Sequence, residues 1–481
     1  MNAWFWVFIS YIILNFLIMI SMIFIERRKL SSVISWLTVL TFLPILGFLF
    51  YVVFGSGLSI RVRRMISNHK LYGMEYDQQI IKYFDGAQIS QSDKDLIGIV
   101  KCCYNYGSIL CPQNEVKIFT NGPDKIQALL FDIENAKHSI NIEYYIFADD
   151  KTGKQVMNAL IKKAKEGVKV KLIYDSIGCL GAPRRFFRKL KKAGGEIAEF
   201  FPPFAYIRMI NLKMNYRNHK KIVVIDGKIA YTGGININNN HMGLNKKLSP
   251  WRDTHIRITG TGVYPLQNIF LNDWRYVKKE NYPSSYYMEK GMFPEPENNG
   301  DVFLQVVVSG PDNPVQNIKE AYIKLITNAK REILIQTPYF IPDESFMSAL
   351  RIALASGVSI KIMVPSKPDH RTAFWVTQSY LKEFVELGVD VYFYDGFLHS
   401  KTLVVDDEIL SIGTCNLDNR SFNLNFEDTV ILYSKKLNKE YKGYFKQDLQ
   451  HCKQADIFYF KKKLFLTKFA QALFRLFSPI L

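Results

Sequence analysis

The chain has 481 residues, which is too long for one hydrophobic core, so two compact domains with an appendage are expected. Hydrophobic residues make up 48% and charged residues 22% of the sequence, a balance that excludes an intrinsically disordered protein. The formal net charge of +18 favours an anionic partner, either nucleic acid or an anionic lipid surface, and does not choose between them.

The N-terminal end, residues 1–56, is predicted to be a two-helix membrane anchor. Residues 3–25 form an apolar run without a charge, and a spanning helix needs about 20 such residues. A second uncharged run, residues 33–54, contains Pro44 and Gly47, which helices in lipid tolerate. A signal peptide is disfavoured because there is no basic n-region and a second apolar run follows at once.

The orientation of this hairpin is not fixed by its flanking charges. Basic residues lie on both sides of the second run, at 27–29 and at 61–64, so the positive-inside rule has no single answer. A re-entrant or tilted hairpin would put both clusters on the cytoplasmic side, and we expect the soluble part there. Residues 57–114 are predicted to be a juxtamembrane linker.

The soluble part contains an internal repeat. The triplet Asn-Ala-Lys at 135–137 recurs at 328–330, and each copy is typical of a helix end that leads into a buried strand. An amphipathic helix, a Gly-Val turn and a further strand follow in both halves. This alternation predicts an α/β fold with two similar lobes, residues 115–295 and 296–455. Their boundary is expected in the Pro/Glu/Asn/Gly-rich stretch at 293–300.

Each half also carries one copy of the motif His-x-Lys-x4-Asp: His219, Lys221 and Asp226 in the first half, and His399, Lys401 and Asp406 in the second. The pattern is typical of a strand that ends in a turn. Side chains alternate between the faces of a strand, so the His and Lys of each copy share a face. The Asp has the opposite parity, which favours a role in supporting the turn.

The spacing beyond the motif repeats as well. A glycine, Gly233 or Gly413, falls seven residues after the motif Asp, and an asparagine, Asn236 or Asn416, falls ten residues after it. A lone His-x-Lys is usually part of a surface strand. Two equivalent copies in a repeat make that explanation a poor one.

This set of side chains fits phosphodiester transfer. A nucleophile reaches an anionic phosphorus only where cations neutralise its oxygens, and Lys221 and Lys401 supply that charge, with Asn236 and Asn416 as neutral donors. One histidine can attack, while the other protonates the leaving alcohol and then deprotonates the incoming one. Two half-sites that meet at a pseudo-twofold axis would place one histidine on each side of the phosphorus.

This chemistry requires no cofactor and no metal, and the sequence contains no HExxH, Walker or Asp-rich metal motif. The six cysteines form no CxxC pair. Each histidine needs a partner that fixes its tautomer. Asp253 and Glu427 are candidates, and a surface ion pair is the alternative for either.

The C-terminal residues 456–481 mix Phe, Leu and Tyr with lysines and an arginine. This pattern predicts a basic amphipathic segment in a lipid headgroup layer. A helix packed on the soluble core is the alternative.

These motifs resemble those of the phospholipase D superfamily and, within it, of the bacterial cardiolipin synthases, over essentially the whole chain. The paired His-x-Lys motifs carry the first resemblance. The narrower one rests on the hairpin end at 44–55 and on four segments: Ile-Glu-Tyr-Tyr-Ile-Phe at 142–147, Trp-Arg-Asp-Thr at 251–254, Pro-Tyr-Phe-x-Pro at 338–342, and Gly-Thr-x-Asn-Leu-Asp-Asn-Arg-Ser-Phe at 413–422.

The resemblance implies a ping-pong transfer. His219 would attack the phosphorus of one phosphatidylglycerol and release glycerol protonated by His399, and a second phosphatidylglycerol would attack the phosphatidyl-histidine to give cardiolipin. Asp253 and Glu427 match the positions of the histidine-orienting carboxylates. The implied partners are phosphatidylglycerol and an anionic bilayer, not nucleic acid, and the implied location is the bacterial cell membrane, as a multi-pass protein.

The chain departs from the family pattern at 238–241, where Asn-Asn-Asn-His stands in place of the frequent Gly-Asp-Glu-Tyr. The acceptor preference is therefore left open, and His241 is interpreted as a loop histidine. A hydrolase that passes the intermediate to water, and a transferase that uses another alcohol as donor or acceptor, are the alternatives. A nuclease would not need the anchor, and a scaffold would not need intact His and Lys in both halves.

Overall fold

The computed structural model describes residues 3–24, 30–43, 46–47, 51, 94–202, 216–280, 291–296, 300–462 and 465–476. Most of the predicted linker, the basic clusters at 27–29 and 61–64, and part of the predicted lobe boundary lie outside these residues.

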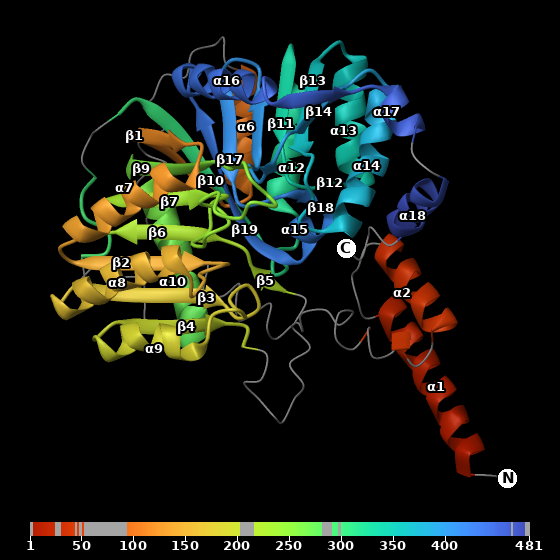
Figure 1. Ribbon diagram of the computed structural model, residues 1–481, viewed down its shortest axis with the longest axis horizontal. Coiled ribbons are helices and arrows are strands. Elements are labelled where there is room, and N and C mark those ends of the chain that lie inside the picture. The colour runs from red at the N-terminus through yellow and green to blue at the C-terminus, as the bar shows by residue number, and fades with distance from the viewer. Residues whose placement is uncertain are drawn as a thin grey trace.

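The first half of the soluble part alternates strands with helices (Figure 1). Its helices are α7 (Gly122–Asn135), α8 (Lys151–Lys165), α9 (Arg184–Lys192) and α10 (Val263–Lys278). Its strands are β1 (Leu110–Phe119), β2 (Ser139–Tyr144), β3 (Lys169–Asp175), β4 (Glu196–Phe200), β5 (Arg217–Asn218), β6 (Lys221–Ile225), β7 (Ile229–Gly233), β8 (Trp251–Arg252) and β9 (His255–Gly260).

The second half repeats this plan and adds elements at its end. Its helices are α12 (Asn317–Asn328), α13 (Glu344–Ala355), α14 (Arg371–Glu386), α15 (Asn419–Asn423), α16 (Lys435–Leu449), α17 (Ile457–Lys461) and α18 (Phe465–Leu476). The helix α6 (Lys94–Asn105) precedes β1 in the chain and packs against α12 of this half. Its strands are β10 (Val302–Ser309), β11 (Glu332–Gln336), β12 (Phe340–Ile341), β13 (Ser359–Pro365), β14 (Asp390–Tyr394), β15 (Phe397–Leu398), β16 (Thr402–Val405), β17 (Ile409–Gly413), β18 (Leu417–Asp418), β19 (Asn425–Tyr433) and β20 (Cys452–Ala455).

One mixed sheet runs through both halves. From its centre outward, the order is β1-β9-β7-β6-β2-β3-β4 in the first half and β10-β19-β17-β16-β11-β13-β14-β20 in the second. The antiparallel pair β1–β10 joins the two series. The predicted α/β fold is confirmed, and the two series have the same strand order, although they share a single sheet.

Helices cover both faces of this sheet, which is why its central strands are buried on both sides. Along β6, Ile222 and Val224 point into one core and Val223 and Ile225 into another. The first core contains residues of α10 and α16 and is common to both halves. The opposite face has separate cores beneath α7, α8 and α9 and beneath α12, α13 and α14.

The repeated helices also begin alike. Asp150 caps α8 by accepting a hydrogen bond from the backbone N–H of Gly153, and Asp343 caps α13 by accepting from that of Phe346. The internal repeat therefore extends to the hydrogen bonds that start equivalent helices.

At the N-terminus, α1 (Ala3–Phe24) projects away from the sheet and contacts α2 (Leu30–Phe42) (Figure 1). Some side chains of α1 lie outside the described residues. Within the part of the chain that the structure describes, no helix combines the length and apolarity needed to cross a membrane. The predicted transmembrane hairpin stays a prediction.

At the C-terminus, α18 packs on α14. Gln471 donates a hydrogen bond to Gln378 at 2.9 Å, and Arg475 pairs with Glu383 at 3.1 Å. Among the described side chains of α18, the large apolar ones of Phe469, Leu473 and Leu476 are exposed. The segment thus combines a helix packed on the core with an exposed apolar face.

Candidate active site

Two short strand pairs cross from one half to the other and hold the motif histidines. β5 pairs in parallel with the start of β19, and the backbone N–H of His219 then bonds the carbonyl oxygen of Phe426 at 2.9 Å. β8 pairs in parallel with β15, and the backbone N–H of His399 bonds the carbonyl oxygen of Arg252 at 2.7 Å. Each histidine is therefore fixed to a strand of the opposite half. We call His219 with Lys221 the first half-site, and His399 with Lys401 the second half-site.

In the first half-site, the His219 Nδ1 atom lies 2.9 Å from Oε2 of Glu427. The Thr414 hydroxyl donates to the same Oε2 at 2.6 Å, and the Asn425 amide donates to Oε1 at 3.0 Å. The His219 ring also packs edge-on against Tyr145, with the ring centroids 4.7 Å apart. Glu427 is fully buried, so a charge on it depends on these donors and on the nearby Lys221.

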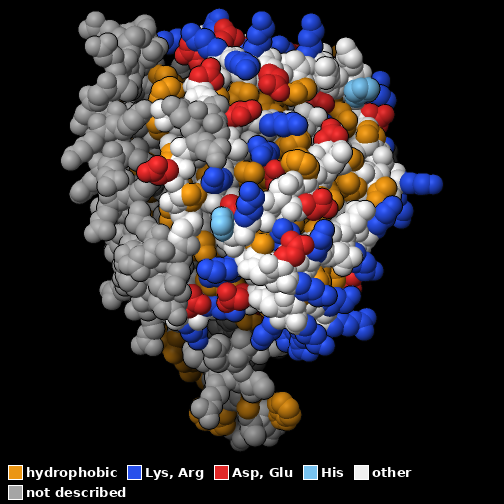
Figure 2. Space-filling model, turned by 90° about the vertical axis from the view of Figure 1, so that its left-hand side faces the viewer, with side chains coloured by type: hydrophobic (Ala, Val, Ile, Leu, Met, Phe, Trp, Pro, Cys, Tyr) orange, Lys and Arg blue, Asp and Glu red, His pale blue; other side chains and the backbone are white. Residues whose placement is uncertain are grey.

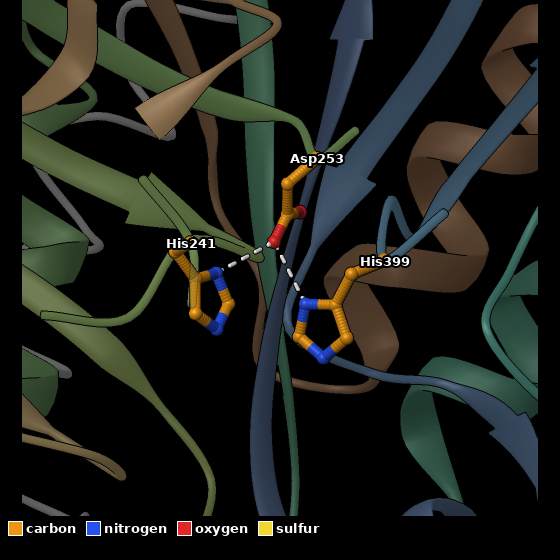
Figure 3. Close-up of side chains that lie close together, drawn as sticks. All are labelled: His241, Asp253 and His399. Atoms are coloured by element: carbon orange, nitrogen blue, oxygen red, sulfur yellow. Dashed lines mark hydrogen bonds and ion pairs between the residues drawn. The ribbon is translucent and has the colours of Figure 1, made fainter. Parts of the chain in front are cut away.

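In the second half-site, the His399 Nδ1 atom lies 2.7 Å from Oδ2 of Asp253, and the His241 Nδ1 atom lies 3.1 Å from the same oxygen (Figure 3). The backbone N–H of Thr254 donates to the other carboxylate oxygen at 2.7 Å. A Cβ atom on Gly234 would lie 2.0 Å from that oxygen, so glycine is required beside the carboxylate. The Asp253 side chain is held in one place from all these directions.

Both predicted tautomer-fixing carboxylates thus lie against a motif histidine. The pairing is crossed: Glu427 of the second half holds His219, and Asp253 of the first half holds His399. With a carboxylate at each Nδ1, the proton lies on Nδ1 and the Nε2 lone pair is available for chemistry.

The two lysines lie close to these rings. Lys221 Nζ donates to the carbonyl oxygen of His219 at 2.7 Å, and Lys401 Nζ donates to that of His399 at 2.5 Å. Burial lowers the pKa of Lys221 to about 8 and that of Lys401 to about 7, although nearby carboxylates oppose this shift. An anion that entered the site would favour the protonated lysines, so the site is suited to bind negative charge.

Burial also favours neutral imidazoles. Burial, together with the charges of Lys221 and Lys401, holds the pKa of His219 well below its usual range. Burial and Lys401 have the same effect on His399, against the pull of Asp253. Either ring can therefore act as a nucleophile or a base at neutral pH.

The two carboxylates differ in charge. Burial raises the pKa of Glu427 to about 7, against the opposing charge of Lys221. Burial would raise the pKa of Asp253 too, but His399, His241 and Lys401 together hold it well below its usual range. Asp253 is a permanent anion at neutral pH, whereas Glu427 is close to its titration point.

Asp226 and Asp406 lie at the turns that follow β6 and β16, at the far end of each strand from the motif lysine. Their carboxylates accept three successive backbone N–H groups, of residues 137–139 and 330–332, at 2.7 to 3.0 Å. Their φ angles are +53° and +50°, a conformation that favours Asp and Asn among non-glycine residues. This geometry agrees with the turn-supporting role expected from their parity.

The two motif asparagines differ. Asn236 accepts the backbone N–H of Ile146 at 3.2 Å, and its amide nitrogen lies 3.2 Å from Nε2 of His241. The side-chain oxygen of Asn416 is buried and has no hydrogen-bond partner among the described residues. Asn416 therefore keeps hydrogen-bonding capacity for a ligand, whereas the Asn236 amide is already engaged.

Four residues of the site were not predicted from the sequence: Tyr145, His241, Thr414 and Asn425. His241 does lie in a turn, as expected of a loop histidine, but it is only 3% exposed and bonds Asp253. Its signal in the sequence was the departure from the family pattern at 238–241. Tyr145 and Thr414 lie within segments that carry the resemblance, and Asn425 lies two residues before Glu427.

One cluster in the site has the composition of a metal centre. The ligand atoms of His241, Asp253 and His399 all lie within 4.8 Å of one another, and two imidazoles with a carboxylate are donors that zinc accepts. The same atoms form the two hydrogen bonds to Asp253 Oδ2 (Figure 3). A bound metal ion would therefore replace the bond that orients His399.

Comparisons with known proteins match this architecture. The family model described as cardiolipin synthase, PLD-like domain matches residues 129–274 and 322–449, which is one match in each half. The model described as phospholipase D-nuclease N-terminal matches residues 13–56. The major cardiolipin synthase ClsA of Bacillus subtilis is 42% identical over 479 residues, which are 98% of this chain and 98% of that protein.

The chain is also similar to a second cardiolipin synthase and to a solved structure of a phospholipid synthase. A cardiolipin synthase of Staphylococcus aureus is 40% identical over 482 residues, which are 99% of this chain and 96% of that protein. Among solved structures, the phosphatidylserine synthase of Haemophilus influenzae Rd KW20 aligns with a TM-score of 0.60 over 80% of this chain and 100% of that chain. The sequence identity in that alignment is 16%, so it supports a common fold.

Proposed function

Because this chain belongs to the cardiolipin synthase family of the phospholipase D superfamily, we propose that it converts two molecules of phosphatidylglycerol into cardiolipin and glycerol. The observation that carries the proposal is the pair of His–Lys half-sites, in which each histidine is held by a carboxylate of the opposite half.

In the first step, Nε2 of His219 attacks the phosphorus of one phosphatidylglycerol. The bond between phosphorus and the glycerol oxygen breaks, an N–P bond forms, and Nε2–H of His399 gives its proton to the departing glycerol. Lys221 and Lys401 neutralise the phosphate oxygens, and that bound negative charge favours a protonated His399.

In the second step, the acceptor is a glycerol hydroxyl of another phosphatidylglycerol. His399 takes the hydroxyl proton, the oxygen attacks the phosphorus, and the N–P bond to His219 breaks. His399 is then protonated again for the next donor molecule, so the two steps use the same pair of side chains in both directions.

The charges of the two carboxylates support this division of roles. A general acid must carry a proton, and an ionised carboxylate such as Asp253 stabilises the imidazolium form of His399. Glu427, with a pKa of about 7, exerts a weaker pull on His219 and leaves it a neutral nucleophile. We assign the nucleophile to His219 and the acid and base to His399.

The lipid substrates require a membrane, and we propose a multi-pass anchor within residues 1–56 with the site on the cytoplasmic face. The match of residues 13–56 to the family's N-terminal model supports an anchor there. So does a set of large apolar side chains exposed along α1: Trp4, Phe5, Trp6, Val7, Ile12, Ile13, Leu14, Phe16, Leu17 and Ile20. The exposed apolar side of α18, with basic residues nearby, supports a second contact with the headgroup layer.

Surface charge supports an anionic bilayer as the partner. Six basic side chains along α9 are exposed: Arg184, Arg185, Arg188, Lys189, Lys191 and Lys192. Figure 2 shows the face of the molecule on which this helix lies, with Lys and Arg gathered toward its lower edge. Each basic residue close to an anionic lipid surface contributes about 1 kcal/mol to membrane binding.

The test is product analysis with purified full-length enzyme in detergent micelles that contain phosphatidylglycerol alone, with EDTA and without CDP-activated lipid. Cardiolipin and glycerol are expected in equal amounts, and a His219→Ala/His399→Ala double variant should form neither. Phosphatidic acid in place of cardiolipin would support the hydrolase alternative. Absence of turnover by correctly folded enzyme in both micelles and bilayers would overturn the synthase proposal.

A further inference from the structure

His241 is a buried imidazole that takes no part in the two proposed steps. Its Nδ1 atom shares Oδ2 of Asp253 with Nδ1 of His399, at 3.1 Å and 2.7 Å (Figure 3). Building on the proposed function, we propose that His241 is a positioning residue for the acid–base step, which divides the Asp253 carboxylate between two N–H donors and so limits its pull on His399.

The hydrogen-bond network fixes the tautomer of His241. The side-chain oxygen of Asn236 accepts the backbone N–H of Ile146, so the NH2 group of this amide is the group that faces His241. An NH2 group donates, and Nε2 of His241 must accept at 3.2 Å. The backbone N–H of Asn236 also points toward Nδ1, at 3.3 Å, but the Asp253 carboxylate is the closer neighbour, at 3.1 Å, and can only accept. The single proton of the neutral ring therefore lies on Nδ1, where it is donated to Asp253.

In the first half-site, a carboxylate oxygen is likewise shared by two donors, but the second donor is a different side chain. There the oxygen that holds His219 is Oε2 of Glu427, and the Thr414 hydroxyl also donates to it, at 2.6 Å. In both half-sites, the carboxylate oxygen that orients the catalytic ring is shared with a second neutral donor. His241 has at Asp253 the place that Thr414 has at Glu427.

The position of the His241 ring is closely determined. The ring lies 4.4 Å from the Trp251 ring, and it stands at 86° to the His399 ring with a centroid distance of 5.0 Å. On the other side of the carboxylate, Gly234 and the Thr254 amide leave no room for Asp253 to turn. Removal of the His241 N–H would therefore leave His399 as the single hydrogen-bond donor to Oδ2 of Asp253 among the described residues.

The expected consequence is a more basic His399. Burial and the charge of Lys401 lower the pKa of His399, whereas Asp253 raises it. Other charged or titratable groups act on the same site through Asp253 or His241 and stay in place when His241 is replaced: Lys125, Lys221, Arg252 and His255. The change in His399 can then be attributed to the lost donor.

The experiment compares His241→Phe, which removes the donor, with His241→Gln, which keeps an N–H group. The substrate is a phosphatidyl ester of p-nitrophenol, whose departure needs no proton, with phosphatidylglycerol as acceptor. Turnover is then limited by acceptor attack on the phosphatidyl-enzyme, in which His219 has already reacted and no longer needs ionised Glu427. This step needs unprotonated His399, so the acid limb of the kcat profile reports the pKa of this ring, whereas the acid limb of kcat/KM reports groups of the free enzyme.

In His241→Phe, we expect the acid limb to move to higher pH by about one unit, because a hydrogen bond to a charged group is worth about that much. With phosphatidylglycerol as donor, kcat should fall about tenfold and KM should change less than about threefold. His241→Gln should restore part of both effects. His138→Phe is the control, since this exposed histidine lies at the turn held by Asp226, away from Asp253, and its limb should stay in place.

An unmoved or downward-shifted limb in folded His241→Phe would overturn the inference, because a merely structural role lowers kcat without changing the limb. Zn²⁺ inhibition of the wild type that EDTA reverses and His241→Phe abolishes would also overturn it, in favour of a metal site. If the wild type makes no cardiolipin at all, the proposed function fails. If it does and only the limb test fails, the role of His241 alone is wrong.

Discussion

The two half-sites have equivalent strands, the same His–Lys spacing and a carboxylate supplied by the opposite half, yet the pKa values of the two carboxylates shift in opposite directions. Burial raises the pKa of Glu427 to about 7, whereas His399, His241 and Lys401 outweigh burial at Asp253 and keep its pKa well below the usual range. A repeated fold thus contains two chemically different histidines. We infer that the asymmetry comes from the residues around each carboxylate, because the backbone plan is shared.

The crossed pairing makes the two halves dependent on each other. His219 depends on a carboxylate of the second half, and His399 on one of the first. Neither half can orient its own histidine, so the catalytic unit is the pair of halves joined by one sheet.

The strongest test of the asymmetry replaces each histidine. His219→Ala should lose more than about 10⁴-fold in kcat because the nucleophile is gone, and His399→Ala about 10²- to 10⁴-fold because proton transfer is lost. With the p-nitrophenol ester, His399→Ala should still release one equivalent of nitrophenol in a burst, whereas His219→Ala should not. A burst in His219→Ala would reverse the assignment.

The next largest effect concerns the crossed carboxylates. Glu427→Gln and Asp253→Asn should each lower kcat about 10²- to 10⁴-fold, since an amide in place of the carboxylate favours the wrong tautomer. Because Asp253 serves the acid, the nitrophenol burst should survive in Asp253→Asn and disappear in Glu427→Gln. Equal bursts in the two variants would contradict the crossed assignment.

The pH dependence of kcat/KM should be a narrow bell near pH 7. Glu427 must be ionised, and its raised pKa means that activity is lost as the pH falls through about 7. Lys221 and Lys401 must be protonated, and their lowered pKa values mean that activity is lost as the pH rises through about 7 to 8. Lys401→Arg keeps its charge, so the alkaline limb should move up toward the pKa of Lys221 even if the maximum falls about tenfold. An alkaline limb unchanged in this variant would exclude Lys401 as its cause.

The smallest effect on catalysis is expected at the two turns. Asp226→Ala and Asp406→Ala remove the acceptor for three backbone N–H groups and should each lower the free energy of unfolding by about 1–3 kcal/mol. The kcat of folded enzyme should change less than about threefold. Asp226→Asn, which tolerates the positive φ angle and keeps one acceptor, should lose less stability in thermal unfolding. A large fall in kcat without a loss of stability would instead place Asp226 in the chemistry.

Much of this site could be predicted because its residues lie in a repeat. The spacing identified His219 and His399 with their lysines, and strand parity separated Asp226 and Asp406 from the chemistry. The crossed pairing was not predictable, because it depends on the short strand pairs β5–β19 and β8–β15, whose partners are more than 140 residues apart. The contact of His241 with Asp253 was not predictable for a related reason, since burial beside Asp253 is a property of packing and not of its local sequence.

The central claim is that the two half-sites divide the chemistry, with the covalent bond formed at His219. Its most direct test is mass spectrometry of His399→Ala after rapid quenching with the p-nitrophenol ester, which should trap the intermediate. A phosphatidyl adduct is expected on the peptide that contains His219. An adduct on any other residue, or no adduct despite a full nitrophenol burst, would show that His219 is not the nucleophile.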